Sequence, residues 1–174
     1  VQKLGINGQN SGRQSMAWAE FSLDTIRAVR RRTRASVNDI MLTILGEGIE
    51  EYLRAHDMLS SQNFVRMIIP VNLREEDKPE DEFGNRISVL PIEVPFYKAN
   101  MLDKLEAVRE YTKVMKESAL SDGIDMLFTL PAFTPAAAQP LIWAVVPRGF
   151  TLVAHMWATN VPGPQFPLYL LGRR

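Results

Sequence analysis

The chain has 174 residues and 46% of them are hydrophobic, which is enough for one domain, or one half of a larger two-lobed protein, to bury a core. Lysine and arginine number 20 and aspartate and glutamate also number 20, so no overall charge favours nucleic acid or an anionic membrane as a partner. The sequence has no cysteine, which excludes a disulfide scaffold and a zinc–thiolate site.

The first residues have the composition of a connection. Residues 3–15, KLGINGQNSGRQS, are rich in Gly, Asn, Gln and Ser, so we expect a flexible linker over residues 1–15 and a folded unit over residues 16–174. The chain begins with Val1 and stops soon after the apolar run LYLL, so we expect both ends to be cut from a longer protein.

A strand and a helix follow the linker. Residues 16–23, MAWAEFSL, alternate apolar positions and contain aromatic residues, which predicts a strand. Asp24 begins a predicted helix that ends near Arg34. Its arginine-rich last turns indicate a solvated helix end that complements the helix dipole, with an anion site as the alternative.

The segment SVNDIMLTILGEGIEEYLRAH predicts an amphipathic helix because its apolar residues recur with a period close to 3.6. Gly46 and Gly48 each cost this helix about 1 kcal/mol relative to alanine, so another element is expected to pack close to the backbone there. Ser36 and Asp39 have the spacing of a capping box. Asn38, in the same first turn, has no such explanation and is available to a loop or to a substrate.

The middle of the chain predicts two strands and a helix. Residues 64–74 and 85–96 are strand-like and are joined by the charged loop EEDKPEDEFG. Their prolines favour bulges or edge positions, and they are Pro70, Pro91 and Pro95. Residues 100–119 then predict a long amphipathic helix.

The last third is more apolar. Residues 124–146 are interrupted by Asp125 and three prolines, which indicates broken, buried helices rather than a membrane span. Residues 149–160 and 167–172 predict strands. The order of elements favours a mixed sheet with helices packed on it, in the α/β or α+β class.

The sequence shows no complete catalytic centre. Its only histidines are His56, at a predicted helix end, and His155, in a predicted strand without a nearby acid to orient it. A core histidine bonded to the backbone and a general base both remain open for His155. The sequence contains no nucleophile elbow, no glycine-rich phosphate loop and no metal-ligand spacing.

The stretch TNVPGP, residues 159–164, predicts a rigid corner after the strand, because two prolines flank a glycine that can adopt φ values closed to other residues. It is either a plain turn or a fixed loop that holds Thr159 and Asn160 against a substrate.

Four stretches together resemble a known family. SVNDIMLTILGEGIEEYL, MIIPVNLR, GNRISVLPIEVP and TNVPGPQFPLYLLG are similar, in order and spacing, to the C-terminal half of the bacterial wax ester synthase/acyl-CoA:diacylglycerol acyltransferase family. The resemblance extends from about Ala17 to Gly172. It implies one lobe of a two-lobed CoA-dependent acyltransferase fold, truncated at its C-terminal end, with acyl-CoA and the acceptor alcohol meeting between the lobes.

The resemblance also implies an activity. Members transfer a fatty acyl group from acyl-CoA to a long-chain alcohol or diacylglycerol, and the base is the second histidine of an HHxxxDG motif in an N-terminal lobe, which is absent here. The fragment alone is therefore expected to be inactive, with that lobe as its partner, acyl-CoA as substrate and no further cofactor. We expect a cytoplasmic protein, with peripheral contact to a membrane or lipid droplets.

The resemblance carries substrate-binding residues onto this chain. Asn38 and Asp39 match the family's ND pair, and Thr159 keeps the hydroxyl of a position where many relatives have serine. A hydroxyl or amide at the corner could stabilise the tetrahedral oxyanion or position a loop. The remaining candidates match the PVxxR strand, the GN turn and the NVPGP corner, and they are Arg74, Gly84, Asn85, Asn160, Pro162 and Gly163.

Other interpretations stay open at this point. A lone lobe could be a non-catalytic lipid- or protein-binding module, or the related lobe of a peptide-synthesis condensation domain. The apolar stretch 124–146 could line an acyl channel or touch lipid, through Met126, Leu127, Phe128, Leu130, Phe133 and Trp143. An isolated lobe exposes the face that should meet its partner, so self-association is expected.

Overall fold

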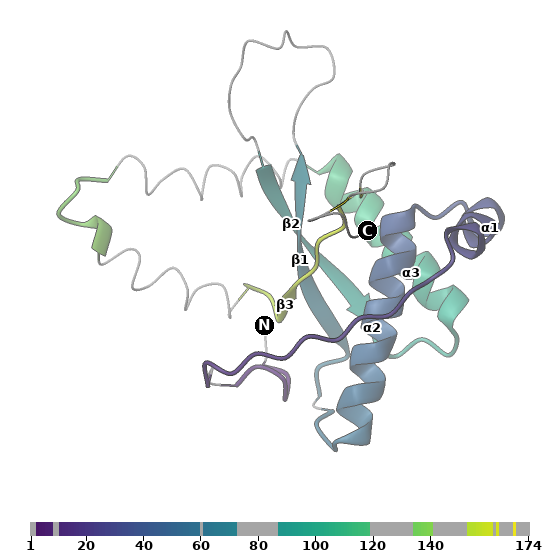
Figure 1. Ribbon diagram of the computed structural model, residues 1–174, viewed down its shortest axis with the longest axis horizontal. Coiled ribbons are helices and arrows are strands. Elements are labelled where there is room, and N and C mark those ends of the chain that lie inside the picture. Colours follow the sequence, from purple (N-terminus) through teal and green to yellow (C-terminus); the bar gives the residue numbers. More distant parts are fainter. Residues whose placement is uncertain are drawn as a thin grey trace, which may run out of the picture.

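A computed structural model describes residues 3–8, 11–59, 61–72, 87–118, 134–140, 153–161, 163 and 169. In chain order, its helices and strands are α1 (Leu23–Thr33), α2 (Val37–Ala55), β1 (Phe64–Asn72), β2 (Ile87–Pro95), α3 (Met101–Glu117) and β3 (Met156–Trp157) (Figure 1). The helices predicted from Asp24 to Arg34, over SVNDIMLTILGEGIEEYLRAH and over residues 100–119 are therefore confirmed, as are the two long strands, with ends that move by no more than two residues.

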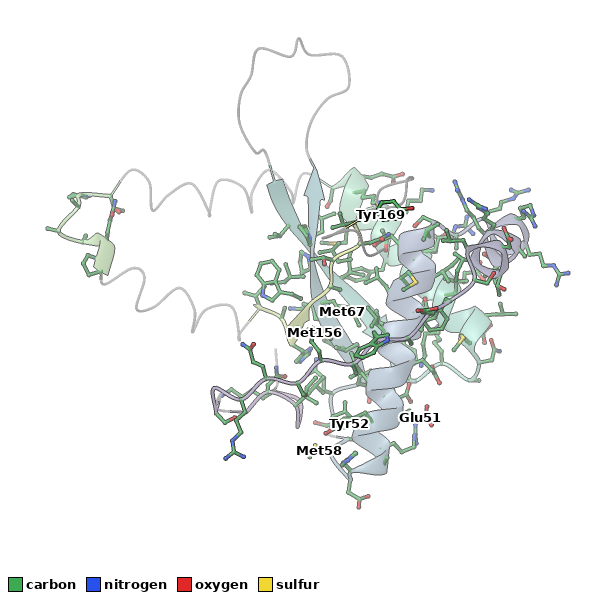
Figure 2. The ribbon with its side chains drawn as sticks, in the orientation of Figure 1. Glu51, Tyr52, Met58, Met67, Met156 and Tyr169 are labelled. Atoms are coloured by element: carbon green, nitrogen blue, oxygen red, sulfur yellow. The ribbon has the colours of Figure 1, made fainter. Side chains whose placement is uncertain are left out.

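The described strands form one mixed sheet in the order β2-β1-β3. β1 and β2 are antiparallel along their whole length, from Phe64 opposite Pro95 to Asn72 opposite Ile87. β3 pairs with β1 in parallel through Met156 and Trp157, and Figure 2 shows Met156 beside its partner Met67. A mixed sheet with packed helices confirms the predicted α/β class.

Helices α2 and α3 cover one face of this sheet (Figure 1). Alternate side chains of β1 and β2 point toward them, because successive residues of a strand face opposite sides. The resulting core includes Val65, Met67 and Ile69 of β1, Leu90, Ile92 and Val94 of β2, Leu42 and Leu53 of α2, and Val108 and Met115 of α3. Burying each of these side chains contributes about 1.5–3 kcal/mol.

Local sequence explains where the helices begin and end. Ser36 caps α2, and the Asn100 side chain accepts a hydrogen bond from the Asp103 backbone N–H at the start of α3, at 2.9 Å. α1 ends at Arg34, which adopts the left-handed conformation with φ 58°. Its last-turn arginines, Arg30, Arg31 and Arg32, are all exposed, as the predicted solvated helix end requires.

The three strand prolines make no bulge. β1 and β2 pair one to one through Pro70, Pro91 and Pro95. The carbonyl groups of Arg66 and Ile68 accept hydrogen bonds from the β3 segment, so this alternate set of β1 residues points its backbone away from β2. Pro91 and Pro95 stand opposite this set, and their missing N–H groups therefore face the outer side of β2. Pro70 lies in the middle strand, beyond the last residue that pairs with β3.

The strand expected at the N-terminus is wrong. Residues 16–22 are extended but pair with no strand in the described chain, because the alternating pattern alone supplies no partner. The expected linker is partly packed on the domain, since Leu4 is 2% exposed and belongs to the main core. The Asn7 side chain also donates to the His155 carbonyl at 2.8 Å.

The C-terminal third is described only in part. β3 is much shorter than the strand expected over residues 149–160. Of the apolar stretch 124–146, only residues 134–140 are described, so its expected broken helices and channel-lining residues lie outside the described residues, as does the strand over 167–172 except for Tyr169. None of the helices in the described ranges is both long and apolar enough to cross a membrane.

Candidate functional site

The first turn of α2 contains a complete capping box, which confirms the prediction. The Ser36 hydroxyl accepts a hydrogen bond from the Asp39 backbone N–H at 3.1 Å. In return, Asp39 Oδ2 accepts from the Ser36 backbone N–H at 2.8 Å and from its hydroxyl at 2.7 Å. One carboxylate oxygen therefore carries all of the capping, and it lies at the end of the helix where the dipole favours negative charge.

The other carboxylate oxygen of Asp39 is not used by the cap. Asp39 is 5% exposed, and its Oδ1 is buried without a hydrogen-bond partner among the described residues. A buried acceptor left unpaired costs about 1–3 kcal/mol, and more when it is charged. Asn38, next to it, is half-buried. The helix start thus offers one carboxylate oxygen that intrahelical bonding does not explain.

The corner after β3 lies at the surface. The Ala158 N–H donates to the Ile68 carbonyl at 2.9 Å, and this bond is the last recorded one before Thr159 and Asn160, which are both exposed. Gly163 is exposed as well, and a Cβ there would meet nothing within 4 Å. Pro162 lies outside the described residues.

The C-terminal ends of β1 and β3 point toward the same end of the sheet. β1 ends at Asn72, directly opposite Ile87, the first residue of β2. β3 runs parallel to β1, so the chain leaves β3 at the same end of the sheet on the way to Thr159. Arg74, Gly84 and Asn85 belong to the connection between β1 and β2 and lie outside the described residues. Within the described ranges, no hydrogen bond joins Thr159 or Asn160 to the start of α2.

His155 is part of the sheet's hydrogen bonding. It is 8% exposed, and its Nδ1 accepts a hydrogen bond from the Arg66 backbone N–H at 2.8 Å. The His155 backbone N–H donates a hydrogen bond to the Arg66 carbonyl at 2.9 Å. The lone pair of this ring nitrogen already accepts a hydrogen bond from a backbone N–H, so it cannot also accept a proton from a substrate. This geometry supports the core interpretation of His155.

His56 has a local role at the other end of α2. It is exposed, stacks on Tyr52 with ring centroids 4.2 Å apart, and its Nδ1 lies 2.8 Å from the Tyr52 carbonyl oxygen. Because a carbonyl only accepts, the ring donates this bond, which satisfies a carbonyl at the helix C-terminus. The predicted surface role at a helix end is confirmed.

Sequence reasoning missed the ion pair on the opposite face of the sheet. Arg66 and Glu93 are cross-strand partners, and Arg66 Nε donates to the Glu93 carboxylate at 3.0 Å. The Arg66 Nη1 also donates to the Val153 carbonyl at 3.2 Å. Arg66 therefore joins β2, β1 and the segment before β3. The register between strands determines this pair, and neither strand's own pattern reveals it.

A second charged cluster joins α2 to α3. Lys104 is 2% exposed, and its ammonium donates hydrogen bonds to Glu50 at 2.6 Å and to Glu47. Burial alone would lower the pKa of Lys104, but the hydrogen bonds and charges of Glu47 and Glu50 outweigh it, so the pKa is raised above its ordinary value of 10.5. Lys104 is therefore a permanently charged structural bridge at neutral pH.

The described residues contain no group of His, Cys, Asp and Glu that could hold a metal ion. The geometry provides instead a helix start with one unused carboxylate oxygen and an exposed polar corner. Family comparison adds the missing context: a model described as the WS/DGAT C-terminal domain matches residues 83–174. The chain belongs to the WS/DGAT C-terminal domain family.

Relatives of this WS/DGAT chain cover almost all of it. The "O-acyltransferase WSD" of Acinetobacter baylyi is 27% identical over 173 residues, covering 97% of this chain and 36% of that protein. The "Probable diacyglycerol O-acyltransferase Tgs4" of Mycobacterium tuberculosis is 27% identical over 171 residues, covering 95% of this chain and 34% of that protein. The WS/DGAT chain thus spans about a third of the length of these relatives.

A solved structure shares the fold of this WS/DGAT chain. It is the wax ester synthase/diacylglycerol acyltransferase from Marinobacter aquaeolei VT8, with a TM-score of 0.59 and 21% identity. The match covers 87% of this chain and 32% of that one. At this level of identity, the likeness establishes the α/β fold rather than the residues that act in it. The resemblance found in the four sequence stretches is confirmed at the level of the family.

Proposed function

We propose that this chain is the C-terminal part of an O-acyltransferase that moves a fatty acyl group from acyl-CoA to a long-chain alcohol or to diacylglycerol. Membership of the WS/DGAT C-terminal family is the observation that carries the proposal. The names of the relatives, which are O-acyltransferases from bacteria, support the reaction class.

The reaction needs a base that this chain does not supply in its described part. The acceptor hydroxyl attacks the thioester carbonyl, the carbon–sulfur bond breaks, and the proton of the alcohol passes through the base to the departing CoA thiolate. His155 has one ring nitrogen committed to Arg66, and His56 lies at an exposed helix end. We assign the base to the second histidine of an HHxxxDG motif in an N-terminal lobe.

Within this proposal, the chain supplies one wall of the site. The unused oxygen of Asp39, with Asn38 beside it, accepts a hydrogen bond from the other lobe or from the substrate. Thr159 and Asn160 face the developing oxyanion or hold the loop that does so. Substrate-binding roles are proposed on the family resemblance for the remaining positions, Arg74, Gly84, Asn85, Pro162 and Gly163.

The partners follow from the same proposal. Acyl-CoA is a substrate and no additional cofactor takes part, while the N-terminal lobe completes the site. The products are apolar lipids, so we place the protein in the cytoplasm, in peripheral contact with a membrane or with lipid droplets.

An ester-formation assay tests the proposed function. The 174-residue chain, an N-terminal lobe with HHxxxDG, and the two joined in one polypeptide are each incubated with palmitoyl-CoA and either hexadecanol or dioleoylglycerol. We expect ester and an equimolar amount of CoA thiol only from the joined polypeptide. Both products should be lost when the second histidine of HHxxxDG is replaced by alanine. Ester from the 174-residue chain by itself would contradict the proposal.

A further inference from the structure

The extended segment between the N-terminal turn and α1 is unusually apolar for a surface strand. Four large side chains lie along it or at its end, and their exposed fractions are 91% for Met16, 86% for Trp18, 52% for Phe21 and 63% for Leu23. Figure 1 shows the segment as an extended trace that leads into α1. Contiguous exposed apolar side chains on a folded domain mark a surface that another molecule or domain covers.

The backbone of the same segment is unpaired as well. Residues 14–21 make no recorded backbone hydrogen bond, although each carries an N–H and a C=O group in an extended conformation. A lipid surface would bury the side chains but would leave these groups without partners. A neighbouring strand satisfies both the side chains and the backbone.

A comparison with β2 shows that not every strand edge in the described sheet is open to pairing. The outer side of β2 has lost two donors to Pro91 and Pro95, which is how natural sheets prevent further strand addition. The segment from Gln14 to Ser22 contains no proline, and Glu20 is its one charged residue. Its chemistry is therefore that of a strand which pairs with another.

α1 holds the segment in a defined place. Ile26 is buried in a cluster with Ala35, Ile40 and Leu105, and Arg109 of α3 donates to the Thr33 carbonyl at 3.3 Å. The helix that directly follows the segment from Gln14 to Ser22 is thus fixed to α2 and α3. A partner that pairs with this segment would be positioned relative to the whole described domain.

We propose that residues 14–22 add as a β-strand to a sheet of the N-terminal lobe, with Met16 and Trp18, which share one face of that strand, buried between the two lobes. This inference rests on the proposed function for the existence of that lobe. The relatives match nearly the whole chain, yet the chain spans about a third of their length, so about two thirds of such a protein is available as the occupant. Strand addition supplies main-chain hydrogen bonds, and the alternate side chains supply specificity.

Hydrogen exchange on the full-length polypeptide tests the pairing. We expect amides 14–21 to exchange at least 100-fold more slowly in the full-length protein than in the 174-residue chain, while the amides of β1 are protected in both. Equal exchange of residues 14–21 in the two forms would overturn the proposal. Protection in the 174-residue chain that rises with concentration, together with a doubled mass in sedimentation, would also overturn it and indicate a second copy as the partner.

Thiol labelling tests the burial of the side chains. Trp18→Cys is compared with Val114→Cys, which places a thiol on the exposed side of α3, where Val114 is 60% exposed. This chain has no cysteine of its own, so each variant adds one thiol to it, and labelling is located by peptide mass. We expect position 18 to react at least 10-fold more slowly in the full-length protein than in the 174-residue chain, and position 114 to change little. Unchanged reactivity at position 18 would overturn the proposal.

The same preparations separate this inference from the proposed function. Ester formation is measured on the unsubstituted full-length protein. A protected segment in a protein that makes no ester would leave the interface intact and remove the enzyme assignment. Ester formation by a protein with a fully exposed residue 18 would remove the interface and leave the enzyme assignment intact.

Discussion

Gly46 of α2 lies directly against Val94 of β2. A Cβ at position 46 would overlap Val94 Cγ1 and approach the Val94 Cβ to 3.0 Å, which a packed core does not allow. Two residues further along the same helix, a Cβ at Gly48 would meet nothing within 4 Å. The two glycines therefore have different roles, and the expected close packing is confirmed for Gly46 and wrong for Gly48.

This difference predicts opposite effects of alanine at the two positions. Gly46→Ala gains about 1 kcal/mol of helix propensity but overpacks the α2–β2 contact at a cost of about 1–3 kcal/mol, so we expect a net loss of stability. Gly48→Ala has the gain in helix propensity without any overpacking and should stabilise the protein by about 1 kcal/mol. Urea unfolding measures both changes as shifts of the midpoint, provided that the dependence of the unfolding free energy on urea concentration is the same for all variants. A stabilised Gly46→Ala variant would contradict the close approach.

The two glycines also show what the sequence could and could not predict. Gly46 recurs with Leu42 and Leu53 on the buried side of α2, so its position relative to the sheet was available from the helical period. Gly48 lies on the exposed side of the same helix. The periods of α2, α3, β1 and β2 predicted these elements well because each pattern is local and long.

Features that depend on a distant partner could not be predicted in the same way. Residues 16–22 have a strand's alternation, but a strand forms only where a neighbour supplies hydrogen bonds, and the described chain offers none. The Arg66–Glu93 pair depends on strand register. For the candidate site, the capping box was predictable because it is local, whereas the unused Asp39 oxygen required knowledge of what surrounds it.

The Lys104 bridge predicts a large loss of stability on substitution. Lys104→Met leaves Glu50, which is only 10% exposed, with Arg54 at 2.7 Å as its remaining partner, so we expect a loss at the lower end of the about 3–5 kcal/mol that breaking a buried pair costs. Lys113→Met on the exposed side of the same helix is the matched control and should change stability by less than about 0.5 kcal/mol. Denaturant unfolding at pH 7 measures both, and equal effects would refute the bridge.

The same lysine predicts a stability decrease at alkaline pH. Because the folded-state pKa of Lys104 is raised above 10.5, the ammonium is present in folded and unfolded chains at neutral pH, and its contribution is complete there. Above pH 10.5 the unfolded chain loses the proton first, so the contribution declines as the pH rises through the folded-state pKa. The difference in stability between the native chain and Lys104→Met should therefore shrink above pH 10.5, and a difference that grows there would contradict the raised pKa.

The two carboxylate oxygens of Asp39 predict a separation of stability from activity. Ser36→Ala removes the cap and should cost about 1 kcal/mol without a direct effect on turnover. Asp39→Asn can keep one oxygen on the Ser36 N–H and loses only the helix-dipole term of about 0.3–1 kcal/mol, but it replaces the other oxygen by a donor. We expect this second variant to lose ester formation at least 10-fold in the joined polypeptide. Equal turnover by both variants would limit Asp39 to capping.

His155 is predicted to be structural rather than catalytic. His155→Phe leaves the Arg66 backbone N–H without its acceptor, which costs about 1–3 kcal/mol for a buried group. Turnover per folded molecule in the joined polypeptide should stay within about twofold, since the ring nitrogen serves the sheet. Thermal unfolding and ester formation are measured on the same sample. A stable but inactive His155→Phe variant would show that this histidine acts on the substrate.

Thr159 gives the most direct test of the polar corner. Thr159→Val keeps the shape of the side chain and removes its hydroxyl, and the residue is exposed, so stability should change by less than about 0.5 kcal/mol. If the hydroxyl stabilises the oxyanion, kcat in the joined polypeptide should fall by about 100- to 1,000-fold, while Thr159→Ser retains most of the activity. Val161→Ala, at an exposed position of the same corner, is the control. Normal turnover by a folded Thr159→Val variant would remove the hydroxyl from the mechanism and leave the corner with a structural role.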